Sequence, residues 1–234
     1  MTGPSRLGAA LGAFASGWRA IAGSRRTGGT VPEAVDPGPS PEPRVDPAPL
    51  RDAFAATGAF APDFDWAAVD RLFALDGGTD AVDYLSALAE HEAGARVASD
   101  GRIDFADPIA LDRFAAFALD VEPDEGVYRD LLATLRRLAR PVPVGEPGFR
   151  PAGGDTVRLS FDCGDAPFDA PVAVGGKWLD GAVPEHVART VCAVSDEPLV
   201  LVPVDAVVHA LRFAPDRLGP FVRATGLEVA VPSA

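Results

Sequence analysis

The stretch Leu199-Val200-Leu201-Val202-Pro203-Val204 is almost continuously apolar, and Glu197-Pro198 and Asp205 bound it on either side. A short apolar run between polar residues is typical of a strand that is buried on both of its faces. We therefore predict a buried central strand here and interpret the surrounding segments as the elements that cover it.

The segments around this strand alternate between strand and helix patterns. In chain order they predict two strands, a helix, the central strand, a helix capped by Asp205, a short helical stretch and a last strand: Val157–Phe161, Pro171–Val174, Glu185–Val194, Leu199–Val204, Asp205–Phe213, a stretch to Thr225, and Leu227–Val231. This order predicts an α+β fold with a small mixed sheet of about four strands and helices on one face.

The segment before it, residues 50–140, has helical periodicity with Asp and Gly between the periodic stretches. The predicted helices are Leu50–Thr57, Trp66–Leu75, one capped by Thr79 or Asp80, one that Asp107-Pro108 opens and that runs through Ile109 to Ala118, and Asp124–Arg140. Short loops between such helices favour a small helical bundle.

Proline and glycine divide the chain into five segments. We predict a basic amphipathic helix over 1–22, a flexible Pro/Gly-rich linker over 23–49, a helical domain over 50–140, a linker over 141–155 and an α/β domain over 156–234. The first linker contains enough proline to favour extended conformations, so it would let residues 1–22 reach far from the rest of the chain.

The N-terminal segment combines an apolar stripe with positive charge. The stripe residues recur at helical spacing, and the first 30 residues contain four arginines but none of the 34 acidic residues; the residues concerned are Leu7, Leu11, Phe14, Trp18 and Ile21, and Arg6, Arg19, Arg25 and Arg26. Gly8, Gly12 and Gly17 each cost a helix about 1 kcal/mol relative to Ala. We therefore expect a helix here only when the stripe covers a surface.

Three surfaces are open to that stripe: the protein's own body, a bilayer interface with anionic headgroups, and a hydrophobic groove on a partner protein. The length of the linker favours a target outside the chain. No apolar run is long enough for a membrane span, so attachment would be peripheral.

The composition of the whole chain is acidic, with a formal net charge of −13. This charge argues against nucleic-acid binding, which needs a basic face. The excess of Asp and the single lysine, Lys177, are typical either of a GC-rich genome or of adaptation to high salt. Cys163 and Cys192 are expected to be reduced thiols in a cytoplasmic protein, because no convincing signal peptide precedes them.

No metal or cofactor is expected. The stretch Asp100–Asp107 resembles the second half of an EF-hand calcium loop, but Arg96 and Ala98 stand where two of its ligands belong. We interpret it, and Asp76–Asp83, as turns followed by helix caps. Cys163, His186 and Cys192 would need a fourth ligand to form a closed zinc site.

The sequence favours a non-catalytic adaptor or regulatory protein that residues 1–22 attach to a membrane surface or to a partner protein. Attachment would raise the local concentration of the acidic body near a second target. One alternative is an enzyme with a site in the C-terminal α/β half, where Asp162, Cys163 and His186 are the first candidates. Another is a structural component of a larger assembly.

Overall fold

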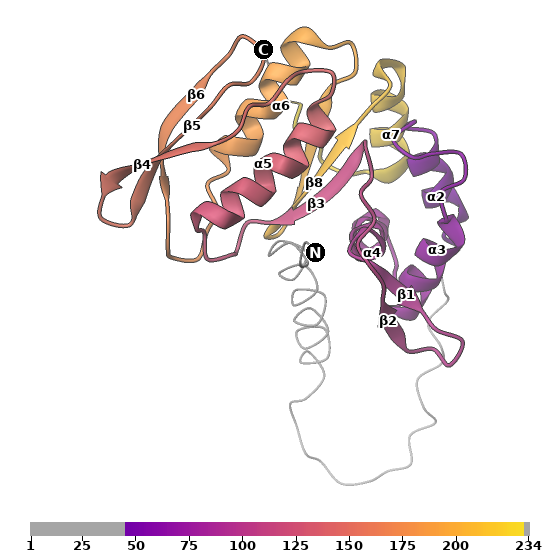
Figure 1. Ribbon diagram of the computed structural model, residues 1–234. Helices are drawn as coiled ribbons and strands as arrows, with labels where there is room; N and C mark the ends of the chain where they lie inside the picture. The colour runs from indigo at the N-terminus through magenta and orange to yellow at the C-terminus, as the bar shows by residue number, and fades with distance from the viewer. Residues whose placement is uncertain (1–44, 232–234) are drawn as a thin grey trace, which may run out of the picture.

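The computed structural model describes residues 45–231 of the chain, which form an α+β fold (Figure 1). Its helices are α2 (Ala48–Ala55), α3 (Trp66–Leu75), α4 (Ala81–Glu92), α5 (Glu125–Ala139), α6 (Ala182–Val194) and α7 (Leu218–Thr225), with the 3-10 helix η1 (Pro215–Arg217). Its strands are β1 (Ala95–Val97), β2 (Ile103–Phe105), β3 (Phe114–Ala118), β4 (Gly148–Gly153), β5 (Thr156–Phe161), β6 (Phe168–Ala173), β7 (Leu199–Val204) and β8 (Val207–Arg212).

The middle layer is the antiparallel sheet β3–β8–β7, in which β8 is the central strand. Both faces of this sheet are buried. Val208 and Ala210 of β8 belong to the hydrophobic cluster that contains α5 and α6. Val207 and Leu211 belong to a second cluster, which contains α2, α3, α4 and α7. The sheet therefore separates two hydrophobic cores.

The helices follow from local signals in the sequence. In α5, the buried residues Tyr128, Leu131, Leu135 and Leu138 recur every three or four positions and form one apolar face. The side chain of Asp124 accepts a hydrogen bond from the backbone N–H of Val127 and so begins the helix. Asp65 and Asp80 cap α3 and α4 in the same way; the predicted helices over these three segments are confirmed.

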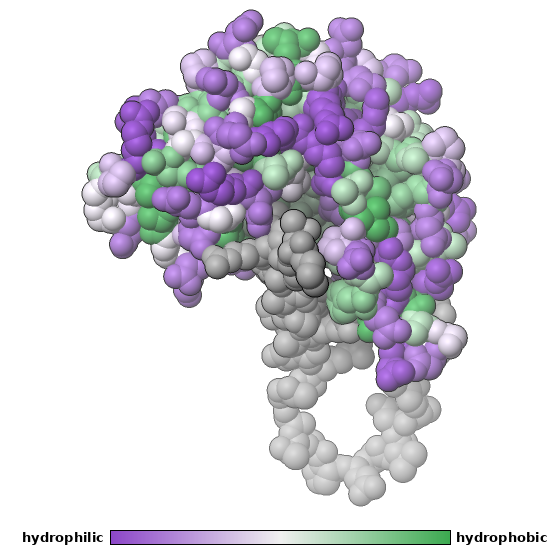
Figure 2. Space-filling view, in the orientation of Figure 1, coloured by the Kyte–Doolittle hydropathy of each residue, from purple (hydrophilic) through white to green (hydrophobic). Residues whose placement is uncertain are grey.

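A second sheet, β4–β5–β6, covers the outer side of α5 and α6 (Figure 1). Its residues Leu159, Phe161 and Val172 join the cluster of those two helices. The third sheet is the short hairpin β1–β2. Figure 2 shows many hydrophilic side chains on one face of the molecule, with hydrophobic side chains between them.

Two predicted helices are strands. Residues Phe114–Ala118 form β3, and the predicted helix from Asp205 to Phe213 is occupied by β8. Asp205 caps no helix: it has φ 51° and lies in the two-residue turn between β7 and β8. Both strands are completely buried, so they lack the alternation that distinguishes a strand from a helix in sequence.

The predicted sheet is also corrected. All strand pairs in residues 45–231 are antiparallel, the sheets have two or three strands, and helices cover both faces of β3–β8–β7. The central strand is β8, whereas β7 lies at the edge. The predicted strand Leu227–Val231 makes only one bridge, between Ala230 and Leu201.

The middle sheet joins segments that the sequence analysis kept apart. Strand β3 comes from residues 50–140 and pairs with β8 from residues 156–234. Strand β4 lies within the predicted linker 141–155, and α2 begins inside the predicted linker 23–49. The predicted helix over 1–22 and most of its linker lie outside the described residues.

Candidate functional site

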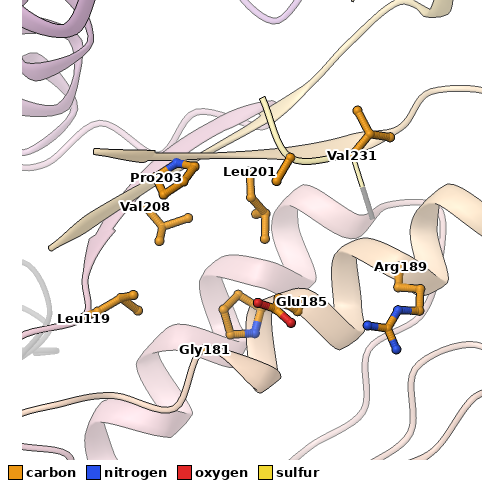
Figure 3. Close-up of a pocket in the computed structure, with 10 residues that line it drawn as sticks. Leu119, Gly181, Glu185, Arg189, Leu201, Pro203, Val208 and Val231 are labelled. Atoms are coloured by element: carbon orange, nitrogen blue, oxygen red, sulfur yellow. The ribbon is translucent and has the colours of Figure 1, made fainter. Parts of the chain in front are cut away.

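A depression on the described surface lies between the start of α6 and the β7–β8 hairpin, and we call it the α6–β7 hollow (Figure 3). Its volume is about 420 Å³, within the range of pockets that bind small ligands or a bulky side chain. Four separate parts of the chain line it: Leu119 after β3; the N-cap Gly181 with Pro184, Glu185 and Arg189 of α6; Leu201, Pro203 and Val208 of the hairpin; and Ala230 and Val231 near the C-terminus.

The floor of the hollow is apolar because it belongs to the edge of the middle sheet. Leu201 and Val208 project from the sheet toward α6, as Figure 3 shows. Val208 is the cross-strand partner of Pro203, so both side chains lie on the same face. Pro203 is exposed, whereas Leu201 is only 6% exposed and Val208 7% exposed. The hollow thus gives access to side chains that otherwise complete the core.

One wall of the hollow is formed by the segment that protects the edge of β7. Leu201 donates a hydrogen bond from its N–H to the carbonyl of Ala230 (3.0 Å), and Ala230 donates one back to Leu201 (2.8 Å). Two positions further along the same edge, Pro203 has no N–H to donate. An edge strand with one bridge and a proline resists pairing with another strand. Binding in the hollow would therefore use side chains rather than strand addition.

Two charged residues of opposite sign line the hollow. Glu185 is exposed, and Arg189 follows it by one helical turn. Three acidic residues are close to lining residues in the chain: Asp120 follows Leu119, Asp180 precedes Gly181, and Asp205 lies in the hairpin turn two residues after Pro203. An apolar floor near several acidic residues favours a ligand that is apolar and carries positive charge.

An exposed tryptophan lies close to the hollow in the chain. Trp178 is 60% exposed, while the next residue, Leu179, is 4% exposed and buried in the core. The N–H of Leu179 donates to the carbonyl of Leu119, a lining residue (2.7 Å). Lys177 precedes Trp178 and is also exposed. This loop therefore carries a large apolar group and the only lysine of the chain beside the hollow.

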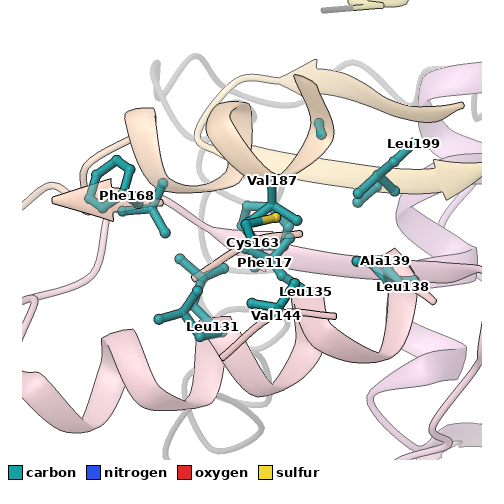
Figure 4. Close-up of a cluster of buried hydrophobic side chains, with 14 of the residues drawn as sticks. Phe117, Leu131, Leu135, Leu138, Ala139, Val144, Cys163, Phe168, Val187 and Leu199 are labelled. Carbon is teal, nitrogen blue, oxygen red and sulfur yellow. The ribbon is translucent and has the colours of Figure 1, made fainter. Parts of the chain in front are cut away.

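The residues suggested for the enzyme alternative do not form a catalytic arrangement in residues 45–231. Cys163 is completely buried among Phe117, Leu135 and Val187 of the α5–α6 core (Figure 4). Burial raises the pKa of its thiol, whereas a nucleophilic cysteine needs a lowered one.

His186, the histidine suggested for the enzyme alternative, makes structural contacts as well. His186 contacts the carbonyl of Ala166 through Nε2 (3.0 Å) and packs edge-on against Phe161 and Phe168. The Sγ of Cys192 donates to the carbonyl of Leu199 (3.5 Å). No hydrogen bond joins Asp162, Cys163 and His186 in the described part of the chain. Among residues 45–231, no three His, Cys, Asp or Glu side chains form a group that could hold a metal ion.

The EF-hand-like stretch is the turn of a hairpin. Asp100 accepts hydrogen bonds from the backbone N–H and from Nε of Arg102, and residues 103–105 form β2. No helix begins at Asp107-Pro108. The turn interpretation is therefore right for Asp100, and the helix cap predicted at Asp107 is wrong.

None of the residues that line the hollow was predicted from the sequence as a site residue. The docking residues that were predicted, from Leu7 to Arg26, lie outside the described residues. Within the described residues, one signal pointed to the hollow: a proline in an otherwise apolar strand indicates an edge strand. Comparison of the chain with protein-family models, with curated proteins and with solved structures finds no match.

Proposed function

We propose that this protein is a non-catalytic, cytoplasmic adaptor or regulatory protein. Residues 1–22 attach it to a membrane surface, such as the inner face of the cell membrane, or to a partner protein. The acidic body then binds a second protein in the α6–β7 hollow. The observation that carries the proposal is the hollow itself: an apolar floor of core residues that remains accessible beside an exposed tryptophan.

Several features of the body support a binding role. Exposed aromatic groups beside an apolar pocket are typical of protein interfaces, where Trp supplies much of the binding energy. Two hydrogen bonds join the sheet edge at the pocket to the C-terminal segment, and such contacts favour a pocket that is formed before a ligand binds. In residues 45–231, no helix is long and apolar enough to cross a bilayer.

The attachment role rests on the sequence of residues 1–22. Phe14 and Trp18 would insert at a bilayer interface or into a groove, and the arginines would bind anionic groups. At an ionic strength of 1 M, electrostatic attraction would be screened beyond about 3 Å. The apolar stripe would then supply most of the affinity.

Co-sedimentation of the full chain with anionic phospholipid vesicles, at low and high salt, tests the membrane form of this proposal. We expect the chain to bind and the double variant Phe14→Ala/Trp18→Ala to lose binding. The matched control is Phe105→Ala/Trp178→Ala, which removes two exposed aromatic side chains from the body instead.

Each outcome has a distinct meaning. Loss of binding in the body variant, with binding retained in the Phe14/Trp18 variant, would contradict the role of residues 1–22. Absence of vesicle binding by the wild-type chain would exclude the membrane form and leave attachment to a partner protein.

A further inference from the structure

We propose that, in the free protein, residues 1–22 dock in the α6–β7 hollow of their own chain and block it until an external target releases them. This inference rests on the proposed function, because it uses the same segment and the same hollow. It adds regulation: the hollow and the external target compete for residues 1–22. Attachment to the target therefore frees the hollow for the second protein.

Residues 1–22 and the hollow are chemically complementary. The sequence of residues 1–22 combines apolar side chains at helical spacing with arginine and no acid. The hollow has an apolar floor, and although Arg189 balances Glu185 in its lining, Asp120, Asp180 and Asp205 are close to lining residues in the chain. A basic amphipathic segment matches an apolar floor with this excess of acidic residues around it.

The hollow has the size of one or two large side chains. A volume of about 420 Å³ accommodates one or two large side chains of a helix rather than a whole helix. Phe14 and Trp18 lie four residues apart, on the same face of a helix and within reach of one pocket. Their neighbours Leu11 and Ile21 would then cover the exposed Trp178 and Val231 beside the hollow.

The connection between residues 1–22 and the body is long enough for docking. Residues 23–44 connect the segment to Val45, where the described chain begins. Fully extended as polyproline, this connection spans about 68 Å, and as a flexible coil it spans about 26 Å on average. A folded body of this size is about 40 Å across. The segment can therefore reach the hollow without strain.

Covalent connection raises the local concentration of residues 1–22 at the hollow. A short flexible connection holds a tethered segment at an effective concentration in the millimolar range. Even an interaction with a dissociation constant of about 100 μM would then keep the hollow mostly occupied. A membrane or partner that binds the same stripe more strongly would vacate it.

The single lysine of the chain makes this arrangement directly measurable. Lys177 lies in the loop that Leu179 fixes to the hollow. In the full-length variant Arg19→Lys, a short amine-reactive cross-linker can join Lys177 to the new lysine, and mass spectrometry identifies the linked peptides. We expect this link, with a yield that does not change when the protein is diluted, because the contact is within one chain.

Matched variants in the Arg19→Lys background test the site. Phe14→Ala/Trp18→Ala should reduce the yield by more than about tenfold, because two aromatic groups leave the hollow. Glu185→Arg should reduce it severalfold, because it reverses one charge of the lining. Asp63→Arg makes the same charge change at an exposed position on the α2–α3 loop and should leave the yield unchanged.

Three results would overturn the proposal. The first is absence of the link in Arg19→Lys, and the second is a link that neither the aromatic variant nor Glu185→Arg weakens. The third is a link between isotopically labelled and unlabelled chains, which would place the segment on a second copy. None of these results decides whether residues 1–22 bind vesicles. Failure of the docking proposal is therefore distinguishable from failure of the proposed function.

Discussion

Glu92 at the end of α4 and Arg137 of α5 form an ion pair, with 3.3 Å between Oε1 and Nη2, that is largely removed from solvent. The second carboxylate oxygen of Glu92 accepts a hydrogen bond from the N–H of Ala116, on the outer edge of β3 (2.9 Å). One side chain thus connects α4, α5 and the middle sheet, and it covers an edge N–H that would otherwise be free to pair with another strand.

Glu92→Gln should change how stability depends on pH. Burial raises the pKa of Glu92 to about 7, although Ala116 and Arg137 act to lower it. Between its ordinary value of 4.5 and about 7, the folded state holds a proton that the unfolded state releases. The contribution of Glu92 to the free energy of unfolding of the wild-type protein therefore falls as pH rises through that window, by about 3 kcal/mol in all.

Urea unfolding at pH 5 and pH 8 measures this effect. The stability of Glu92→Gln relative to the wild type should be higher at pH 8 than at pH 5. Glu228→Gln, at an exposed position, is the control and should show no such difference. Equal relative stabilities of Glu92→Gln at the two pH values would contradict the prediction.

His209→Gln should weaken the acid sensitivity of the fold. Complete burial lowers the pKa of His209 to about 4, while the unfolded chain binds the proton near 6.5. Stability from this group is therefore present above pH 6.5 and is lost as pH falls toward 4, with a slope of about 1.4 kcal/mol per pH unit. Unfolding free energies between pH 4 and 6.5 should lose this slope in the variant, and an unchanged slope would show that His209 does not titrate on unfolding.

Arg212→Lys should destabilise the protein by about 3 kcal/mol. The buried guanidinium donates to the carbonyls of Leu138 (3.1 Å) and Arg140 (2.9 Å) at the end of α5, and to Oγ of Ser195 (3.0 Å). A lysine ammonium cannot reproduce this planar arrangement of donors.

Thermal unfolding compares Arg212→Lys with Arg102→Lys as a matched control. The side chain of Arg102 is 80% exposed and pairs only with the adjacent turn, so its replacement should cost less than about 0.5 kcal/mol. Similar losses in both variants would mean that the contacts of Arg212 contribute no more than a surface ion pair.

Asp205→Gly should leave stability unchanged or raise it slightly, and Asp205→Val should lower it by about 1–2 kcal/mol. The reason is the left-handed backbone conformation at this turn, φ 51°, which glycine adopts freely and a β-branched residue does not. Chemical denaturation of the two variants gives the order directly. A lower stability for Asp205→Gly than for Asp205→Val would contradict the left-handed conformation at this turn.

The sequence was informative wherever local interactions decide the structure. α3, α4 and α5 combine an acidic N-cap with apolar residues every three or four positions, and both signals lie within the helix itself. β3 differs because its pairing partner, β8, is about 90 residues away in the chain. β8 pairs with the adjacent β7 as well, but its burial on both faces removes the alternation that marks a strand. Phe114, Phe117 and Ala118 also fit a helical face, so only the cross-strand contacts distinguish the two structures.

The hollow was beyond sequence reasoning for the same reason. Its lining comes from four segments between Leu119 and Val231, and no segment alone contains a recognisable motif. The burial of Cys163 was equally invisible, because a polar loop of aspartates surrounds it in sequence while the α5–α6 core surrounds it in space. Pro203 alone indicated an edge, and the apolar residues beside it favoured a central strand instead.

The most direct test of attachment through residues 1–22 is the mobility of a fluorescent fusion of the full chain in living cells, compared with Phe14→Ala/Trp18→Ala. This measurement responds to a membrane and to a partner protein alike. We predict that the wild-type protein recovers severalfold more slowly after photobleaching than the variant, because its stripe holds it to a larger structure. Equal recovery rates would contradict an adaptor that is attached through its N-terminal segment.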